Sequence, residues 1–435
     1  MQFPELLNKK IAILGFWREG KSTLHFLLNQ GVKKSDLTIL DKKEINEPEI
    51  NSVFWEDYLN ALDQYDLIFK TAGIQYTPEI RAVQEKTVTQ VQFFFDHFPG
   101  KVVALSASKG KTTMTSLTYQ LLKDAGFPVV LAGNIGKPVL DEIDFDNKDQ
   151  YVVIELSSFM LETLKKKNLI SILGAIFPVH LDWHGSMEDY VEAKKHVLDG
   201  AEKKILFSST KEQYLPEINL DGVTLTWKGT DFTWDESDLL VFWKPFLSRE
   251  KIQLLGEHNL RNICAIIALG FALKIDEEQI KSTISNFTAV RHRLQLVGTF
   301  KGISFYDDAI STSPFSTIAA LDALWDQVDT LFLGGVDGWY DFSWMVEKIK
   351  KSQISNLVLF PDSGERIAKM LGDDAQRFTI LHTREMKEGV EFAYQHTKTW
   401  KIALLSTATP SFSLWKDFEE KGDLFQKFVK ELGEK

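Results

Sequence analysis

The chain has 435 residues, of which 44% are apolar, so it can form two to four domains with sizeable cores. Its formal net charge of −11, without any block of lysine or arginine, argues against a protein that binds nucleic acid. The single cysteine, Cys264, excludes an intrachain disulfide. No apolar stretch is long enough to span a bilayer, so we expect a cytoplasmic protein without membrane insertion.

The N-terminal segment begins with a strand, a glycine-rich turn and a helix. An apolar strand is expected at residues 11–14, and the motif that follows it, GFWREGKS (15–22), matches the written phosphate-loop pattern in full. A second strand, at residues 37–40, ends at Asp41. An acidic residue about 20 positions beyond such glycines usually contacts a ribose or a base. The segment therefore predicts a dinucleotide-type βαβ unit.

Two further elements are expected before the next motif. A third strand, residues 66–73, ends in the loop 71–73, and ligands bind at the carboxyl ends of strands in open α/β sheets. A helix is expected over residues 78–95, and residues 97–100 read as a linker.

A second phosphate-binding pattern lies between residues 101 and 126. An apolar strand, a polar loop and the sequence Lys111-Thr112-Thr113 precede an amphipathic helix. Backbone N–H groups at a helix N-terminus bind anionic oxygens, Lys111 adds a positive charge, and the Thr112 hydroxyl can reach Mg²⁺. The match is imperfect because the full pattern requires glycine at Leu105. The two loops must bind different ligands, or one of them does not bind phosphate. The pattern alone does not distinguish these alternatives.

The central segment contains further candidate side chains. A buried strand at residues 151–158 places Glu155 near its end, where Mg²⁺ ligands occur beside a phosphate loop. A histidine-rich turn at residues 180–184 leads into a helix that carries Lys194, which by itself reads as a surface lysine. At residues 256–262 a helix begins on which Asn262 either shares a functional face or caps the helix.

Residues 297–435 predict another α/β unit. A strand and loop at residues 303–314 precede a helix, and a strand at residues 330–335 ends in a glycine-rich turn. Buried strands are expected at residues 356–360 and 401–406.

The order of these landmarks resembles the Mur ligases over essentially the whole chain. The motifs that carry the resemblance are SASKGKTT (106–113), AGNIG (132–136), ELSSF (155–159), HLDWHGSMEDYVEAK (180–194), GEHNLRN (256–262), RHRL (291–294), YDDAISTSP (306–314) and SFSLWKDFEEKGDLF (411–425). The resemblance implies an α/β fold with three domains. These are a UDP-binding Rossmann-like domain (1–98), a central P-loop ATPase domain with a parallel sheet (99–296) and a Rossmann-like glutamate-binding domain (297–435).

The resemblance also implies a ligand for each loop: ATP for the second and the diphosphate of a UDP-sugar for the first. The implied ATP-binding residues are Ser108, Lys109, Gly110, Lys111, Thr112, Thr113, Asn262, Arg293 and Asp308, with His292 and Asp307 as alternatives to the last two. The implied UDP-sugar-binding residues are Gly15, Gly20, Lys21, Ser22, Asp41, Lys42, Gly73 and Asn134. The implied glutamate-binding residues are Thr312, Ser411 and Phe418.

The implied reaction is an ATP-dependent ligation in peptidoglycan precursor synthesis. ATP converts the carboxylate of UDP-N-acetylmuramoyl-L-alanine to an acyl phosphate, and the amine of glutamate attacks it. The implied catalytic residues are Lys111, Glu155, His180 and Lys194. Thr112 and Glu155 are implied to hold one Mg²⁺, and Glu155, His180 and a carbamylated Lys194 a second. We expect a monomer.

Several positions depart from the family pattern and leave alternatives open. The loop has Ala107 and Lys109 where glycine and asparagine are usual, and Val179 replaces the aspartate before the metal histidine. Lysines that face the carboxylates of D-glutamate are missing at Ile310 and around residues 338–339. D-glutamate is the expected substrate, L-glutamate the alternative, and an inactive UDP-sugar-binding homologue a more distant one. A further hypothesis, a nicotinamide-dependent oxidoreductase, is suggested by the N-terminal βαβ unit alone. The Gly-Lys-Thr sequence and the candidate metal ligands count against it.

Overall fold

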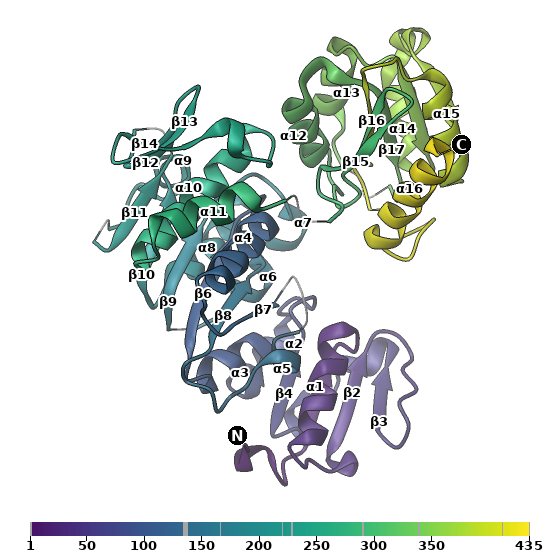
Figure 1. Cartoon of the computed structure of the whole chain (residues 1–435). Helices are drawn as coiled ribbons and strands as arrows, with labels where there is room; N and C mark the ends of the chain where they lie inside the picture. Colours follow the sequence, from purple (N-terminus) through teal and green to yellow (C-terminus); the bar gives the residue numbers. More distant parts are fainter. Residues whose placement is uncertain are drawn as a thin grey trace. The chain divides into compact units, whose positions relative to one another are not determined.

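The computed structural model describes residues 2–133, 138–165, 167–219, 221–227, 229–288, 291–337, 340–410 and 412–434 (Figure 1). The chain divides into two compact units, the first formed by residues 1–251 and 261–285, the second by residues 252–260 and 286–435. The predicted boundary at residues 98–99 stays a prediction, because the first unit contains both sides of it. Among the helices of the described residues, none combines the length and apolarity needed to cross a membrane.

The first sheet of the first unit is parallel and has the strand order β3-β2-β1-β4-β5. Its strands are β1 (Ile11–Leu14), β2 (Leu37–Asp41), β3 (Asn51–Phe54), β4 (Leu67–Lys70) and β5 (Thr87–Val88). Its helices are α1 (Arg18–Asn29), α2 (Pro78–Arg81) and α3 (Gln90–His97). Every residue of β1 is buried, as expected for a strand whose two faces are both covered.

The helix predicted over residues 78–95 is wrong in its extent. The structure ends α2 at Arg81, pairs Thr87 and Val88 with β4, and begins a new helix at Gln90. The Thr89 side chain caps that helix by accepting a hydrogen bond of 3.0 Å from the Gln92 backbone N–H. A local cap and a strand pairing therefore interrupt a segment whose periodicity alone favours one helix.

The second sheet of this unit is also parallel, with the order β11-β10-β9-β6-β8-β7. Its strands are β6 (Lys101–Ser106), β7 (Val129–Gly133), β8 (Tyr151–Glu155), β9 (Asn168–Leu173), β10 (Ala201–Phe207) and β11 (Val223–Thr226). An antiparallel sheet consists of β12 (Phe232–Trp234), β13 (Asp238–Val241) and β14 (Lys244–Ser248).

Helices accompany the second sheet along the chain. They are α4 (Lys111–Asp124), α5 (Val139–Glu142), α6 (Ser158–Leu161), α7 (Leu181–His184), α8 (Met187–Lys195), α9 (Ser208–Tyr214), α10 (Glu257–Ala272) and α11 (Glu277–Asn286). Figure 1 shows α4 and α11 side by side, and the Thr283 hydroxyl joins them by donating a hydrogen bond of 2.7 Å to Asp124. Helix α4 contacts β6, β7 and β8, and a short loop joins the end of β6 to its first turn.

The second unit has one mixed sheet with the order β15-β16-β20-β17-β18-β19. Its strands are β15 (Gln295–Phe300), β16 (Ile303–Asp307), β17 (Val328–Gly334), β18 (Asn356–Phe360), β19 (Thr379–His382) and β20 (Ile402–Leu405), with only β15 antiparallel to its neighbour. Its helices are α12 (Pro314–Leu324), α13 (Ser343–Lys351), α14 (Ser363–Leu371), α15 (Met386–His396) and α16 (Phe418–Gly433). Buried apolar clusters include side chains of β17, β18 and β20 together with helix residues. The predicted α/β class is confirmed, and three large sheets are consistent with three domains.

Candidate active site

Two glycines give the first loop its shape. Gly15 has φ +90°, and a Cβ atom there would lie 2.3 Å from Thr71 Oγ1. A Cβ atom at Gly20 would lie 2.1 Å from the Gly15 carbonyl oxygen. A side chain at either position would clash, so only glycine allows this close approach of the turn, the helix and the loop after β4.

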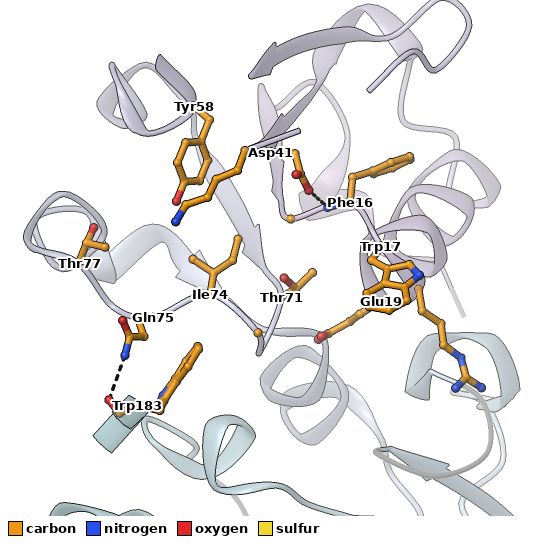
Figure 2. Close-up of a pocket in the computed structure, with 14 residues that line it drawn as sticks. Phe16, Trp17, Glu19, Asp41, Tyr58, Thr71, Ile74, Gln75, Thr77 and Trp183 are labelled. Carbon is orange, nitrogen blue, oxygen red and sulfur yellow. Dashed lines mark hydrogen bonds between the residues drawn. The ribbon is translucent and has the colours of Figure 1, made fainter. Parts of the chain in front are cut away.

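A pocket of about 500 Å³ lies against this loop (Figure 2). It is at the carboxyl ends of β1, β2 and β4, which is where open α/β sheets bind ligands. Its walls come from these strand ends and from the turn of α7, and they consist of Gly15, Phe16, Trp17, Arg18, Glu19, Asp41, Lys42, Tyr58, Thr71, Gly73, Ile74, Gln75, Thr77 and Trp183. The Gln75 side chain donates a hydrogen bond of 2.9 Å to the Trp183 carbonyl oxygen, which ties the α7 turn to the pocket.

Asp41 lies in this pocket and organises its wall. One carboxylate oxygen accepts a hydrogen bond of 2.7 Å from the Phe16 N–H, and the other accepts one of 2.9 Å from the Lys43 N–H. These contacts hold the glycine-rich turn against the end of β2. Each carboxylate oxygen has a second acceptor site, so Asp41 can still accept a hydrogen bond from a ligand.

The structure separates the residues that were predicted for the first loop. Gly15, Asp41, Lys42 and Gly73 line the pocket, whereas Gly20, Lys21 and Ser22 do not. Lys21 is exposed on α1, and the Ser22 hydroxyl donates a hydrogen bond of 2.6 Å to Asp141. The cations among the lining residues are Arg18 and Lys42. Asn134 lies outside the described residues.

The second loop joins β6 to α4. Gly110 has φ +86°, and a Cβ atom there would lie 2.6 Å from Asn262 Oδ1, so Asn262 of α10 packs directly on the loop. The Lys111 ammonium bends back and donates hydrogen bonds of 2.9 Å to the Ala107 carbonyl and 3.2 Å to the Ser108 carbonyl. The structure therefore brings these predicted ATP-binding residues together.

Ser108 anchors this loop to the rest of the unit. Its N–H donates to the Ala175 carbonyl at 2.7 Å, and its hydroxyl lies 2.6 Å from the Tyr190 hydroxyl. Ser108 and Thr113 are buried, whereas Lys109 and Thr112 are half-buried. Protein contacts therefore hold both the backbone and the side chain of Ser108 in place.

Glu155 and Lys194 both lie beside the second loop. Glu155 ends β8, is paired in register with Leu105 of β6, and is 1% exposed. The Lys194 side chain is also 1% exposed, and its ammonium donates hydrogen bonds of 3.0 Å to Ser106 Oγ and 2.9 Å to the Ala107 carbonyl. Burial and the Lys111 ammonium lower the pKa of Lys194 well below its usual value, while Glu155 acts in the opposite direction. The reading of Lys194 as a surface lysine is therefore wrong.

His180 precedes α7 in a left-handed conformation, with φ 58°. Its ring lies edge-on to Phe159 at a centroid distance of 5.0 Å, and Phe159 lies 4.5 Å from the Trp183 ring. Phe159 belongs to α6, which begins three residues after Glu155. The histidine-rich turn therefore packs against α6, the helix that follows β8.

The donor chemistry of this region fits Mg²⁺. Thr112 and Glu155 offer oxygen atoms, which Mg²⁺ prefers. Within the described ranges, no three His, Cys, Asp or Glu side chains gather as a metal cluster. An ion held here would therefore complete its coordination with water and with substrate phosphates, as is usual for Mg²⁺.

The second unit has its own group of buried charges. His292 Nδ1 lies 2.7 Å from Asp307, and both side chains are buried. Asp308 accepts hydrogen bonds of 2.9 Å from the Ser406 hydroxyl and 3.1 Å from the Leu294 N–H, and burial raises its pKa to about 6. Both aspartates accept hydrogen bonds from protein groups, so the predicted role of Asp308, with Asp307 as the alternative, stays a prediction.

Lys421 completes this group and was not among the predicted site residues. It is 0% exposed, and its ammonium donates a hydrogen bond of 2.6 Å to Thr407 Oγ1, just beyond the end of β20. Burial lowers the pKa of Lys421 to about 7, although Asp307 and Asp308 act in the opposite direction. Phe418 begins α16, and its ring lies 6.3 Å from that of His292. Ser411 and residues 338–339 lie outside the described residues.

Comparison with known proteins gives these sites a family context. A family model described as the Mur ligase middle domain matches residues 106–270. The chain is 31% identical to the UDP-N-acetylmuramoylalanine–D-glutamate ligase of Acetivibrio thermocellus, over 98% of this chain and 97% of that protein. The same ligase of Clostridium tetani is 29% identical, with 98% of each chain covered. The chain belongs to the Mur ligase family.

Solved Mur ligase structures have a related fold. The UDP-N-acetylmuramate-alanine ligase MurC of Thermotoga maritima superposes with a TM-score of 0.61 at 18% identity, covering 98% of this chain and 99% of that one. The MurF ligase of Thermotoga maritima, solved in complex with ADP, superposes with a TM-score of 0.61 at 15% identity. The match covers 97% of this chain and 95% of that one. The predicted family is confirmed, and the chain is an ATP-dependent ligase of the Mur type.

Sequence reasoning missed several residues of this Mur ligase. Three residues that line the pocket were not predicted, because the loop pattern specifies only glycine, lysine and serine positions. They are Arg18, Tyr58 and Trp183. Lys421 lies inside the quoted motif FEEKGDLF, and a basic residue within that motif was the available signal. The burial of Lys421 results from tertiary packing, so the sequence alone does not predict it.

The pocket predicts which cation of the first loop matters to this Mur ligase. We expect Arg18→Ala to weaken binding of a UDP-sugar by roughly tenfold to a hundredfold, because a charge-assisted hydrogen bond contributes about 1.5–3 kcal/mol. Lys21→Ala, three residues further along α1, is the matched control and should change the affinity by less than about threefold. Calorimetric titration of both variants measures the difference. A larger loss of affinity in Lys21→Ala than in Arg18→Ala would instead assign the phosphate contact to Lys21.

Proposed function

We propose that this Mur ligase joins D-glutamate to UDP-N-acetylmuramoyl-L-alanine and converts ATP to ADP and phosphate, as a step of peptidoglycan precursor synthesis. The observation that carries the proposal is the 31% identity to a D-glutamate ligase along 98% of the chain. The geometry supports it, because one compact unit has two phosphate-type loops with separate surroundings.

The chemistry requires activation of a poor electrophile. A carboxylate oxygen of the alanyl group attacks the γ-phosphorus of ATP, ADP leaves, and an acyl phosphate forms. The glutamate amine then attacks the acyl carbon, loses a proton, and the tetrahedral intermediate expels phosphate. Positioning and electrostatic stabilisation dominate such phosphoryl transfers. Lys111 would neutralise the phosphoryl charge, and its position over the second loop supports this role.

The first pocket would hold the UDP-sugar with its diphosphate at the N-terminus of α1. Asp41 and Lys42 would meet the uracil nucleoside at the end of β2, and Trp183 would face the sugar. The hydrogen bond between Gln75 and Trp183 supports this orientation, because the turn with Trp183 also carries His180. The alanyl carboxylate would then lead toward the second loop.

Mg²⁺ would be held by Thr112, Glu155, His180 and a carbamylated Lys194, and it would supply charge neutralisation of the phosphates. A lysine ammonium would repel a cation, whereas a carbamate offers anionic oxygen ligands. Lys194 is buried beside Ser106 and Ala107 and within the electrostatic reach of Glu155, which supports its place in this ligand set.

The amino acid would bind in the second unit. Thr312, Ser411 and Phe418 are its proposed contacts, and Lys421 is a buried cation beside the end of β20. Because the family lysine is replaced by Ile310, another cation must offset the carboxylates of glutamate. Lys421 supports retention of D-glutamate, and the absence of the usual lysine at position 310 is the observation that favours L-glutamate.

The test is phosphate release with each enantiomer of glutamate at matched concentration, in the presence of ATP, Mg²⁺ and UDP-N-acetylmuramoyl-L-alanine. We expect D-glutamate to be preferred by tenfold or more, about 1.4 kcal/mol in transition-state stabilisation. Omission of the UDP-sugar is the control and should abolish release. A preference for L-glutamate would establish the alternative substrate, and no release with either enantiomer would indicate a binding protein.

A further inference from the structure

A carboxylate lies in the wall of the first pocket, where negative charge is unexpected beside a diphosphate. Glu19 is the second residue of α1 and follows the glycine-rich turn directly. It lines the pocket, and Figure 2 shows its side chain directed toward the loop that carries Thr71. Phosphate sites at helix N-termini usually present N–H donors and cations, and a carboxylate repels phosphate.

The two carboxylate oxygens of Glu19 have different environments. Oε2 accepts a hydrogen bond of 3.0 Å from the Ala72 N–H. Oε1 is buried and accepts no hydrogen bond from the described residues. Burial raises the pKa of Glu19, and the Ala72 N–H and the Lys70 ammonium offset this only in part. Glu19 therefore lines the pocket and carries a buried acceptor atom that has no hydrogen-bond partner among the described residues.

The main chain of Glu19 is fixed, so the side chain cannot simply turn away with its helix. Its carbonyl oxygen accepts hydrogen bonds of 2.8 Å from the Gln90 side chain of α3 and 3.0 Å from the Thr23 hydroxyl. These contacts hold the first turn of α1 against α3. The packed fold therefore fixes the main chain of Glu19, and the hydrogen bond from the Ala72 N–H holds its carboxyl group at the loop after β4.

The charged groups near Glu19 come from several elements of the first unit. Lys70 of β4 lies on one side, with its ammonium bonded to the Thr71 carbonyl at 3.1 Å, and burial lowers its pKa to about 8. Glu162 acts on Lys70 from another element. Arg18 precedes Glu19 on α1, and Asp41 lies in the same pocket. Helix α3 contributes the neutral Gln90.

We propose that Glu19 takes up a proton when the nucleotide sugar binds, and that Oε1 then donates a hydrogen bond to an oxygen of the ligand's diphosphate. The inference rests on the proposed function in one respect, the identity of the ligand. Phosphate oxygens are acceptors, and an ionised carboxylate is an acceptor only, so the two cannot pair. A nearby like charge also disfavours ionisation of the carboxyl group. Protonation from solvent removes the repulsion and creates the missing donor.

Proton uptake is measured by calorimetric titration of UDP-N-acetylmuramoyl-L-alanine in two buffers of equal pH and different ionisation enthalpy. The diphosphate of a nucleotide sugar is a diester and does not titrate near neutral pH, so the counted protons belong to the protein. We expect the wild-type chain to take up a large fraction of a proton. Glu19→Gln, which keeps the size and a donor, should take up none.

The pH dependence of affinity gives a second readout. Wild-type affinity should fall as the pH rises, by up to about tenfold per pH unit, because the proton must be bound with the ligand. The affinity of Glu19→Gln should stay flat. Glu85→Gln removes an exposed carboxylate outside the pocket and should behave as the wild type. Retained ATP binding by each variant shows that the unit is folded.

Two results would overturn the proposal: binding of the UDP-sugar by the wild type without proton uptake, or uptake that persists in Glu19→Gln. The second result would assign the proton to Lys70, whose pKa burial lowers to about 8. A chain that binds ATP but no UDP-sugar would instead contradict the proposed function. The failures of the two ideas are therefore distinguishable.

Discussion

Lys111→Ala should reduce the rate of ligation by roughly a hundredfold to a thousandfold and leave the affinity for the UDP-sugar within about twofold. Loss of one preorganised group that stabilises transition-state charge typically has an effect of this size. The Lys111 ammonium lies over the second loop, bonded to the carbonyls of Ala107 and Ser108. The pocket proposed for the UDP-sugar is lined by other residues, so its affinity should not depend on Lys111.

Rates of phosphate release and equilibrium binding of both ligands measure this prediction. Lys123→Ala is the matched control, because Lys123 is exposed in the last turn of the same helix and should be silent. A variant at Lys111 that lost the UDP-sugar and kept ATP would show that the assignments of the two loops are inverted.

The sequence predicts local elements well where one signal dominates. The apolar runs at β1 and β2 give strands close to their expected bounds, because parallel strands bury both faces and leave little polar pattern. The strand expected over residues 151–158 ends at Glu155, and α6 begins at Ser158. The glycines at positions 15 and 110 mark turns that the structure requires. The break between α2 and α3 was not predicted, because a cap at Thr89 and a pairing with β4 outweigh helical periodicity.

Placement of side chains in the sites depends on contacts far along the chain. Ser22 fits the phosphate-loop pattern, but its hydroxyl is bonded to Asp141, 119 residues away. The sequence around Lys194 predicts a surface residue, but its ammonium donates a hydrogen bond to Ser106, 88 residues away. Neither partner can be found by spacing within one motif. The same holds for β20, which lies between β16 and β17 although both precede it in the chain.

Lys194→Ala should lose most of the ligation activity, by roughly a hundredfold or more, because the variant lacks a proposed ligand of the Mg²⁺ that would orient and neutralise the phosphates. Carbamylation requires a neutral amine, and the buried site lowers the pKa of Lys194, so this form is accessible. Acetate or another small acid should restore part of the activity of the variant by supplying an oxygen ligand. Labelled bicarbonate should give a carbamate carbon signal in the wild type by carbon-13 NMR and none in the variant.

Lys195→Ala provides the matched control for this prediction. Lys195 is the next residue of α8, is half-buried with its side chain 41% exposed, and pairs with Glu192 at 3.0 Å. Its loss should leave both the activity and the carbamate signal unchanged, because an exposed ion pair contributes little and does not touch the second loop. Full activity of Lys194→Ala, or a wild-type chain that is active without a carbamate signal, would remove Lys194 from the ligand set. Rescue by acetate distinguishes a lost oxygen ligand from a misfolded loop, because a small acid can replace the former and cannot repair the latter.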